Sequence, residues 1–184
     1  MSEEKKERDF YLYGQVDQPS ALELTKSIKT ILRLDDEGRE KLRDFKEEPI
    51  RLFINSYGGE VDSMFALINI IQTSKTPIYT YCTGVAASAA FQIFLAGHKR
   101  FAYKNTRMMY HQIQVCDFGY HAAKEIADNV KENEHLQECI EKFVADRTKL
   151  LPEQLRDIYD CKKEWWIHSD EYFKWGIVDE VLDV

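Results

Sequence analysis

Apolar and polar side chains follow two different periods near the start of the chain. FYLYGQV, residues 10–16, alternates with the period of a half-buried strand, and we expect this strand to end at Gly14. Apolar residues then recur at helical spacing from Pro19 to about Leu34, which predicts an amphipathic helix. The charged segment over residues 33–49 is typical of a solvated surface connection with some helical character.

The order of strand and helix is predicted twice more. IRLFIN, residues 50–55, is typical of a buried strand that ends in the turn signal NSYGGE, and a helix over residues 61–74 follows. The apolar face of that helix comprises Met64, Leu67, Ile68 and Ile71. A strand over residues 77–84 precedes a largely apolar helix over residues 86–97. KRFAYKNTRMMYHQ then predicts two short strands joined around Lys104.

The last third of the chain is mostly helical. A long polar helix is predicted from Tyr120 to Lys149, and a second, short helix starts near Pro152. The apolar stripe of the long helix comprises Ile126, Val130, Leu136, Ile140, Phe143 and Val144. Residues 165–182 are typical of a turn, a helix that closes at Gly176 and a last strand. This succession predicts an α/β fold with parallel crossovers.

Length and charge narrow the class of protein. A chain of 184 residues with 44% hydrophobic side chains predicts a single domain over residues 1–184, with a flexible charged tail over residues 1–9. The net charge of -7 and a pI near 5.3 argue against nucleic acid as a partner. MSEEKKERDF lacks the apolar core of a signal peptide, and no apolar run is long enough to cross a bilayer. We therefore expect a cytoplasmic protein with no membrane partner.

The spacing of cysteines and histidines gives no sign of a metal site. Cys82, Cys116, Cys139 and Cys161 form no C-x-x-C pair, and we interpret them as reduced thiols, most of them filling core space. The five histidines show neither an H-x-x-x-H nor an H-E-x-x-H pair. We expect neither a metal nor another cofactor.

Two predicted strand ends carry unusual chemistry. Gly58 and Gly59 offer backbone amides with no side chain in the way, and Ser88 stands near the start of a helix whose free N–H groups favour negative charge. His111 ends the run RMMYHQ and is the base that a nucleophilic serine needs. Each has a plainer interpretation: a helix cap for Ser88, a packed core residue for His111 and a tight turn for the glycines.

Four blocks of the chain resemble the Clp protease proteolytic subunit (ClpP) family of serine peptidases. The blocks are FINSYGGEV at residues 53–61, TGVAASAA at 83–90, LAGHKRFAYKNTRMMYHQ at 95–112 and YFKWGIVDEVL at 172–182. Several ordered blocks at consistent spacing are far more specific than a lone motif. The resemblance implies a ClpP/crotonase-like fold of repeated ββα units with a long handle helix.

The resemblance also implies roles for individual residues. Ser88 corresponds to the nucleophile and His111 to its general base. The amides of Gly58 and Ala89 correspond to the oxyanion hole, with Gly59 beside them at the substrate backbone. Donors fixed where charge develops on oxygen contribute about a hundredfold or more in rate, and small residues let them approach.

The position of the acid leaves two candidates. The family has an aspartate there, and counting back from Gly176 places the position at Glu164. Counting forward from PEQL places it between Asp160 and Glu164. Glutamate orients the histidine in some Ser-His-acid hydrolases, so Glu164 is the candidate, Asp160 is the alternative acid, and a plain surface acid is the third interpretation.

The implied function is hydrolysis of peptide bonds in peptides or unfolded proteins, through an acyl-enzyme inside a homo-oligomeric chamber. The resemblance implies a ring of roughly seven subunits, or two such rings stacked. Three departures affect assembly: a short segment before the first strand, IQVCDFGY at residues 113–120 in the handle region, and Tyr57 where the family has proline. The short first segment predicts weak or no coupling to an ATP-driven unfoldase.

Two other functions remain open at this point. One is a catalytically inactive ring or scaffold subunit with the same fold. The other is a crotonase-like acyl-CoA enzyme, which uses paired amides to stabilise a thioester enolate. A crotonase-like enzyme would have no use for a pair formed by Ser88 and His111. The presence of both residues also argues against an inactive subunit.

Overall fold

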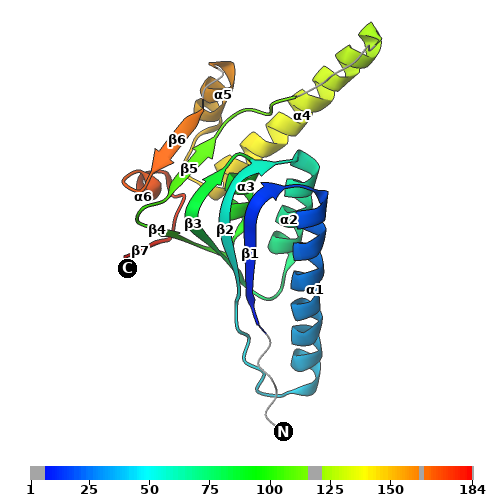
Figure 1. Ribbon diagram of the computed structural model, residues 1–184, viewed down its shortest axis with the longest axis vertical. Helices are drawn as coiled ribbons and strands as arrows, with labels where there is room; N and C mark the ends of the chain where they lie inside the picture. Colours follow the sequence, from blue (N-terminus) through cyan, green and yellow to red (C-terminus); the bar gives the residue numbers. More distant parts are fainter. Residues whose placement is uncertain (1–6, 116–121, 162–163, 184) are drawn as a thin grey trace.

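The computed structural model describes residues 7–115, 122–161 and 164–183. Its elements in chain order are β1 (Asp9–Val16), α1 (Gln18–Lys41), β2 (Ile50–Gly59), α2 (Val61–Thr73), β3 (Ile78–Ala87), α3 (Ala89–Ala96), β4 (Lys99–Tyr103), β5 (Arg107–Tyr110), α4 (Ala123–Arg147), α5 (Pro152–Asp160), β6 (Trp165–His168), α6 (Tyr172–Trp175) and β7 (Glu180–Leu182). Strands and helices alternate through α3, and the predicted α/β class is confirmed. Figure 1 shows this succession in colour from the N-terminus to the C-terminus.

A mostly parallel sheet forms the centre of the molecule. β1, β2, β3, β4 and β7 pair in parallel in that order. Strand β3 changes partner along its length, because Tyr79–Cys82 pairs with β4 and Val85–Ala87 pairs with β5. β6 then adds to β5 in the antiparallel direction. Strands β5 and β6, together with Val85–Ala87 of β3, therefore form a separate part of the sheet. This part carries the site described below.

Asn55 stabilises β3 at the point where it changes partner. Its side-chain oxygen accepts a hydrogen bond from the backbone N–H of Val85 at 3.1 Å. A side chain at Gly84 would meet that same oxygen at 2.5 Å, so only glycine leaves room for the contact. One polar side chain and one missing Cβ thus hold the bend that separates the two halves of the strand.

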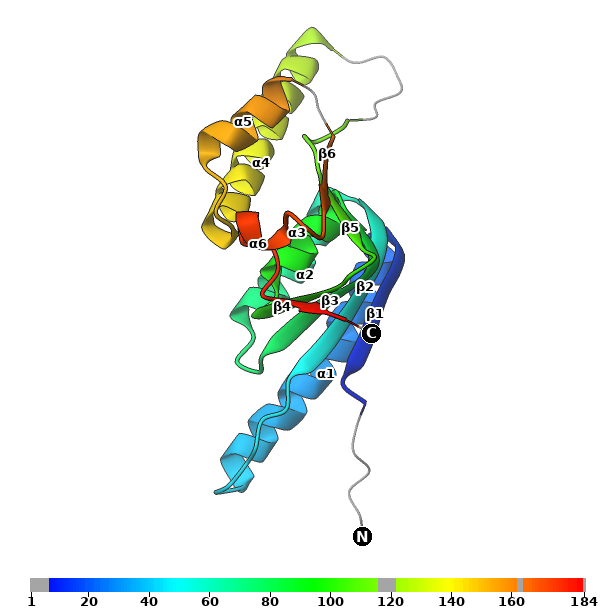
Figure 2. The same cartoon turned by 90° about the vertical axis from the view of Figure 1, so that its left-hand side faces the viewer.

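Helices α1, α2 and α3 lie on one face of the sheet, which Figure 2 shows nearly edge-on. The predicted apolar face of α2 is buried there, and every residue of α3 is buried. The opposite face of β1 to β4 carries no helix in this view. It carries stacked aromatic rings in register across four strands, with centroids 4.6–5.3 Å apart: Tyr11, Phe53, Tyr81 and Phe101.

Helix α1 is longer than the sequence pattern predicts. It continues through Gly38 to Lys41. The last buried residue on its inward face is the carboxylate Asp35, which a search for apolar residues at helical spacing does not find. Asp35 pairs with the guanidinium of Arg8 and accepts a hydrogen bond from Thr76 at 2.7 Å. The Arg8 guanidinium holds the pKa of Asp35 below its ordinary value against the effect of burial. The helical character expected within residues 33–49 is therefore confirmed through Lys41, whereas the burial of Asp35 departs from the expected solvated connection.

The N-terminal segment is also partly structured. Arg8 is tied to α1 by the Asp35 pair, and β1 begins at Asp9, although both residues fall within the tail expected over residues 1–9. Residues 1–6 lie outside the described residues. β1 does not end at Gly14 as predicted, because Gly14 adopts φ +98 and forms an irregularity between Tyr13 and Gln15, after which pairing resumes.

Two predictions for the second half of the chain need correction. WWIH, predicted as a turn, is strand β6, which pairs with β5. The apolar stripe of α4 is buried only in its second half, at Ile140 and Val144, whereas Ile126 and Val130 are 50% exposed. Figure 1 shows the first turns of α4 extending away from the sheet. Tyr120, the predicted start of this helix, lies outside the described residues.

The cysteine prediction holds in part: the three described cysteines are free thiols, as expected, but only one fills core space. Cys82, Cys139 and Cys161 are free, and only Cys82 among them is buried, so the core-filling role expected for most cysteines is wrong for the other two. Cys116 lies outside the described residues. Within the described part of the chain, no helix combines the length and the apolar character that crossing a bilayer requires.

Candidate active site

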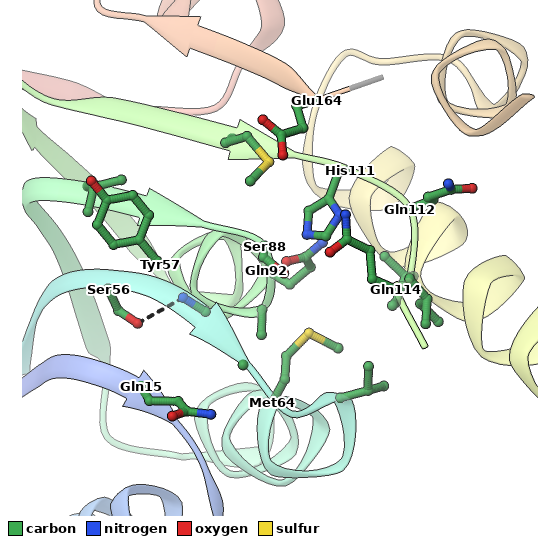
Figure 3. Close-up of a pocket in the computed structure, with 18 of the residues that line it drawn as sticks. Gln15, Ser56, Tyr57, Met64, Ser88, Gln92, His111, Gln112, Gln114 and Glu164 are labelled. Atoms are coloured by element: carbon green, nitrogen blue, oxygen red, sulfur yellow. Dashed lines mark hydrogen bonds between the residues drawn. The ribbon is translucent and has the colours of Figure 1, made fainter. Parts of the chain in front are cut away.

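A cavity of about 700 Å³ lies at the carboxyl ends of β2, β3 and β5. Ligands gather at this edge of parallel sheets, because the loops there present free backbone amides. The lining contains all the residues singled out from the sequence except Asp160, namely Gly58, Gly59, Ser88, Ala89, His111 and Glu164. Figure 3 shows Ser88 and His111 next to each other, with Glu164 beyond the histidine.

Ser88 occupies a strained turn between β3 and α3. Its backbone has φ 54 and ψ -130, and it is the one residue other than glycine with positive φ among the described residues. Such a conformation costs about 1–3 kcal/mol, and a sharp strand-to-helix turn of this kind exposes the side chain of the residue it carries. The hydroxyl makes no capping hydrogen bond to α3, so the helix-cap interpretation does not account for it.

Strand register brings His111 to the same end of the sheet as Ser88. β3 and β5 run parallel, with Ala87 paired to Met109, and the backbone N–H of Ser88 donates to the carbonyl of Met109 at 2.9 Å. Ser88 directly follows one strand, and His111 directly follows the other. Two residues that are 23 positions apart in the chain therefore face one cavity.

The pairing of β6 with β5 brings Glu164 to the cavity. β6 is antiparallel to β5, and the last pair of this ladder is Tyr110 with Trp165. Continuing the ladder by one residue places Glu164 opposite His111, where side chains of an antiparallel pair lie on the same face. Asp160 is exposed at the end of α5 and does not line the cavity.

The three side chains are not yet joined by hydrogen bonds. Within the described residues, none links Ser88 to His111, and the Nδ1 atom of His111 is buried without a partner. Glu164 accepts instead from the indole N–H of Trp166 at 3.3 Å. Burial lowers the pKa of His111 below its ordinary value of 6.5, and the charge of Glu164 raises it in part. The histidine is thus neutral near pH 7, as a general base must be.

The two glycines of the first block have different surroundings. A Cβ at Gly58 would lie 2.7 Å from the Cβ of Ser88 and 2.8 Å from the backbone nitrogen of Ala89, so its absence keeps the space beside that amide open. A Cβ at Gly59 would instead meet the carbonyl of Val16 at 2.1 Å. Gly58 therefore borders the serine, whereas Gly59 permits close packing against β1.

The amide of Gly58 has a partner of its own. Its N–H donates to the hydroxyl of Ser56 at 3.0 Å, and that hydroxyl in turn donates to the carbonyl of Gly14. The dashed line in Figure 3 marks the bond to Gly58. Of the two amides expected to form an oxyanion hole, only that of Ala89 lacks such a partner among the described residues.

Tyr57 belongs to a cluster at the edge of the cavity. Its hydroxyl accepts a hydrogen bond from Arg107 at 2.9 Å, and the guanidinium of Arg107 lies 4.8 Å from the centre of the Trp166 ring. Trp166 is the residue that holds Glu164. The tyrosine that replaces a family proline is therefore linked, through an arginine and a tryptophan, to the candidate acid.

Sequence reasoning missed three residues of this site. Ser56 and Trp166 act on Gly58 and Glu164 through the contacts just described. Gln92 is almost fully buried in the cavity wall, and its side-chain oxygen has no hydrogen-bond partner among the described residues. A polar residue in the otherwise apolar run FQIFLA was the signal available for Gln92.

Comparison with known proteins gives a consistent result over nearly the whole chain. The model of the Clp protease family matches residues 1–184. The ATP-dependent Clp protease proteolytic subunit 1 of Tropheryma whipplei (strain Twist) is 30% identical, over 96% of this chain and 89% of the relative. Subunit 1 from Bifidobacterium longum is 31% identical, over 96% of this chain and 71% of the relative. A solved structure of a ClpP1 mutant from Listeria monocytogenes is 29% identical, with a TM-score of 0.78 over 96% of this chain and 92% of that one.

A serine, a histidine and an acid line one cavity at the strand ends of an α/β sheet, and these are the residue types that hydrolases use to transfer acyl groups. The comparisons narrow this class to a single family. The chain belongs to the Clp protease family, and this membership makes it a peptidase. The expectation of a ClpP-like fold is confirmed by the structural match.

Proposed function

We propose that this protein is a serine endopeptidase that cleaves peptide bonds through an acyl-enzyme on Ser88. The observation that carries the proposal is the pair of strand registers, which directs Ser88, His111 and Glu164 to one cavity. The family assignment supports the same chemistry. Peptides and unfolded proteins are the proposed substrates, and cleavage takes place inside a chamber built from copies of the chain.

In the proposed reaction, His111 takes the proton of the Ser88 hydroxyl as the oxygen attacks the substrate carbonyl. The amides of Ala89 and Gly58 stabilise the oxyanion, and His111 then gives its proton to the leaving amine. In the second half of the reaction, His111 takes a proton from water as the water oxygen attacks the acyl carbonyl, and it returns that proton to the Ser88 oxygen as the carboxylic acid product leaves. Glu164 orients the imidazole and stabilises its charged form.

Two contacts must change before this reaction proceeds. The Gly58 N–H must leave Ser56 to face an oxyanion, and the Glu164 carboxylate must reach the Nδ1 atom of His111. We infer that substrate binding or ring assembly supplies these shifts, because catalytic hydrogen bonds often tighten only in the complex. The proposal covers peptide cleavage with or without an ATP-driven unfoldase, the partner class that the names of the relatives suggest.

A fluorophosphonate probe followed by mass spectrometry tests the proposal directly. It reacts with serines that a neighbouring base activates, so a label on the peptide that contains Ser88 is the expected result. An assembled, folded sample that takes up no label would overturn the proposal. Such a result would favour the second candidate, an inactive ring or scaffold subunit, for which the unpaired Nδ1 of His111 is the supporting observation.

We expect Gly58→Ala to lower kcat/KM for a fluorogenic peptide by about a hundredfold or more. The added methyl group fills the space beside the Ala89 amide, where the oxyanion would sit. Gly14→Ala is the matched control, because Gly14 has almost the same φ, +98 against +97, but no atom lies within 4 Å of an added Cβ. Both variants place a Cβ at positive φ, so similar kcat/KM losses in both would contradict a role for Gly58 at the oxyanion.

We expect light scattering to give a mass several times that of the 21.7 kDa chain. Ile126 and Val130 are 50% exposed on the first half of α4, and Tyr11, at the edge of the row of stacked rings on the sheet, is 56% exposed. Large apolar side chains exposed on a surface are typical of proteins that assemble. A monomer at micromolar concentration would rule out the chamber while leaving the chemistry of Ser88 to be tested separately.

A further inference from the structure

Gln92 lies one helical turn after the candidate nucleophile. Ser88 precedes α3 directly, and Gln92 follows it by four residues, so both side chains project from the same side of that helix into the cavity. Figure 3 shows the carboxamide beside Ser88 and His111. An acyl group bound to Ser88 would therefore have the carboxamide of Gln92 as its neighbour.

The side chain of Gln92 is buried without being satisfied. The residue is 3% exposed, and its Oε1 atom has no hydrogen-bond partner among the described residues. Another buried glutamine, Gln137, shows the usual arrangement: it accepts from the N–H of Ile113 and donates to Tyr110 and Glu141. Buried polar groups in proteins are nearly always paired, so the unpaired oxygen of Gln92 needs an explanation.

Part of the cavity wall is apolar. Met64 of α2 and Ile140 of α4 are both buried apolar residues of the lining, and Val61 lies at the start of α2. A purely apolar substrate side chain would pack against these residues and leave the carboxamide unpaired. A side chain with an apolar stem and an N–H group at its end would pack equally well and also donate to Gln92.

We propose that Gln92 is a specificity-determining residue that selects substrates with a carboxamide side chain, glutamine above all, at the residue before the scissile bond. This inference rests on the proposed peptidase function. A glutamine side chain has two methylene groups for the apolar walls and an amide that both donates and accepts, as the carboxamide of Gln92 does. A methionine side chain in the substrate has nearly the same length and shape but no N–H. Comparing glutamine with methionine therefore measures the effect of the hydrogen bond separately from that of packing.

The size of the preference follows from the buried acceptor. A site built to hydrogen-bond a substrate discriminates against an isostere that leaves its polar group unpaired. One neutral hydrogen bond formed in place of an unpaired buried oxygen gives a preference of about tenfold or more in kcat/KM. The acceptor stands beside Ser88, so the preference is expected in the acylation step.

The experiment compares two fluorogenic peptides that differ only in the residue before the scissile bond, glutamine or methionine. The wild-type enzyme is expected to cleave the glutamine peptide about tenfold faster in kcat/KM, and Gln92→Met is expected to abolish or reverse that ratio. Methionine has nearly the length of glutamine and removes an unpaired buried oxygen, so the variant should fold with little change in Tm.

The matched control is Gln114→Met. Gln114 also lines the cavity, but it is exposed and open to solvent, so it has no buried unpaired oxygen for a substrate to satisfy, and this variant should keep the wild-type ratio. Equal ratios in wild type and Gln92→Met, with Ser88 labelled by the fluorophosphonate probe, would overturn this inference and leave the peptidase function standing. No label on Ser88 and no cleavage of either peptide would instead remove the proposed function, and this inference with it.

Discussion

Replacement of Ser88 by alanine is expected to abolish peptide hydrolysis, with the largest effect of any single substitution in the chain. In serine proteases, loss of the nucleophile lowers kcat on the order of a millionfold, because no neighbouring group can supply the covalent path. Turnover of a fluorogenic peptide and labelling by a fluorophosphonate probe should disappear together. The mass of the assembled protein and its Tm should stay at the wild-type values, because the Ser88 hydroxyl makes no capping hydrogen bond.

Ser74→Ala is a suitable control for this experiment. Ser74 follows α2 and lies outside the cavity lining, and its hydroxyl donates to the carbonyl of Thr76. It should keep full turnover and full labelling. Persistent hydrolysis by purified Ser88→Ala at more than a trace would contradict the proposed mechanism and direct attention to a different nucleophile.

The sequence was sufficient to locate Ser88 and His111 but not to explain how they meet. Their identity followed from ordered blocks of small residues, glycines and a histidine, which local patterns make visible. Their meeting depends on the switch of β3 from β4 to β5 between Cys82 and Val85. That switch is a long-range pairing choice, and a local hydrophobic period carries no information about it.

Two errors in secondary structure have physical causes. WWIH was predicted as a turn because four residues are too few to show a strand period, and the strand exists through its ladder with β5. The end of α1 was misplaced because Asp35, a charged residue, continues the inward face of the helix. Its burial is possible only because Arg8 and Thr76 approach it from other parts of the chain.

The state of the catalytic groups was beyond any sequence pattern. The direction of the Gly58 N–H is a property of one peptide plane, and it is fixed here by the hydroxyl of Ser56. The carboxylate of Glu164 is likewise fixed by the indole of Trp166, a residue that the sequence analysis treated as part of a turn. Both contacts oppose the arrangement that the proposed hydrolysis needs, so the candidate residues line one cavity without the hydrogen bonds that the proposal requires.

The acid is where the structure adds most to the sequence. Counting along the chain left Asp160 and Glu164 as alternatives, and the ladder of β5 with β6 ends at Tyr110 and Trp165, the residues next to His111 and Glu164. Glu164 lines the cavity and raises the pKa of the histidine, whereas Asp160 is exposed outside it. We therefore propose Glu164 as the residue that orients His111, with release from Trp166 as part of its engagement.

Under this proposal, Glu164→Gln is expected to lower kcat by about a thousandfold or more, because the histidine loses the partner that fixes its tautomer and stabilises its charge. Asp160→Asn should leave kcat nearly unchanged. Glutamine keeps the shape of the side chain and can still accept from Trp166, so Tm should change little. A large loss in Asp160→Asn alone would transfer the role to that residue, and indifference to both substitutions would leave a Ser-His pair or an inactive site.

A pH profile separates the orienting role of Glu164 from a merely structural one. Burial lowers the pKa of His111 and the charge of Glu164 raises it, so the acid limb of kcat/KM in the wild type should have its midpoint below pH 6.5. Glu164→Gln removes the raising effect and keeps the burial, so the residual activity should show this midpoint at a still lower pH. Activity lies on the high-pH side of the midpoint in both enzymes, because only neutral His111 accepts the proton of Ser88. An unchanged midpoint would mean that the carboxylate does not act on the histidine during catalysis, even if kcat had fallen.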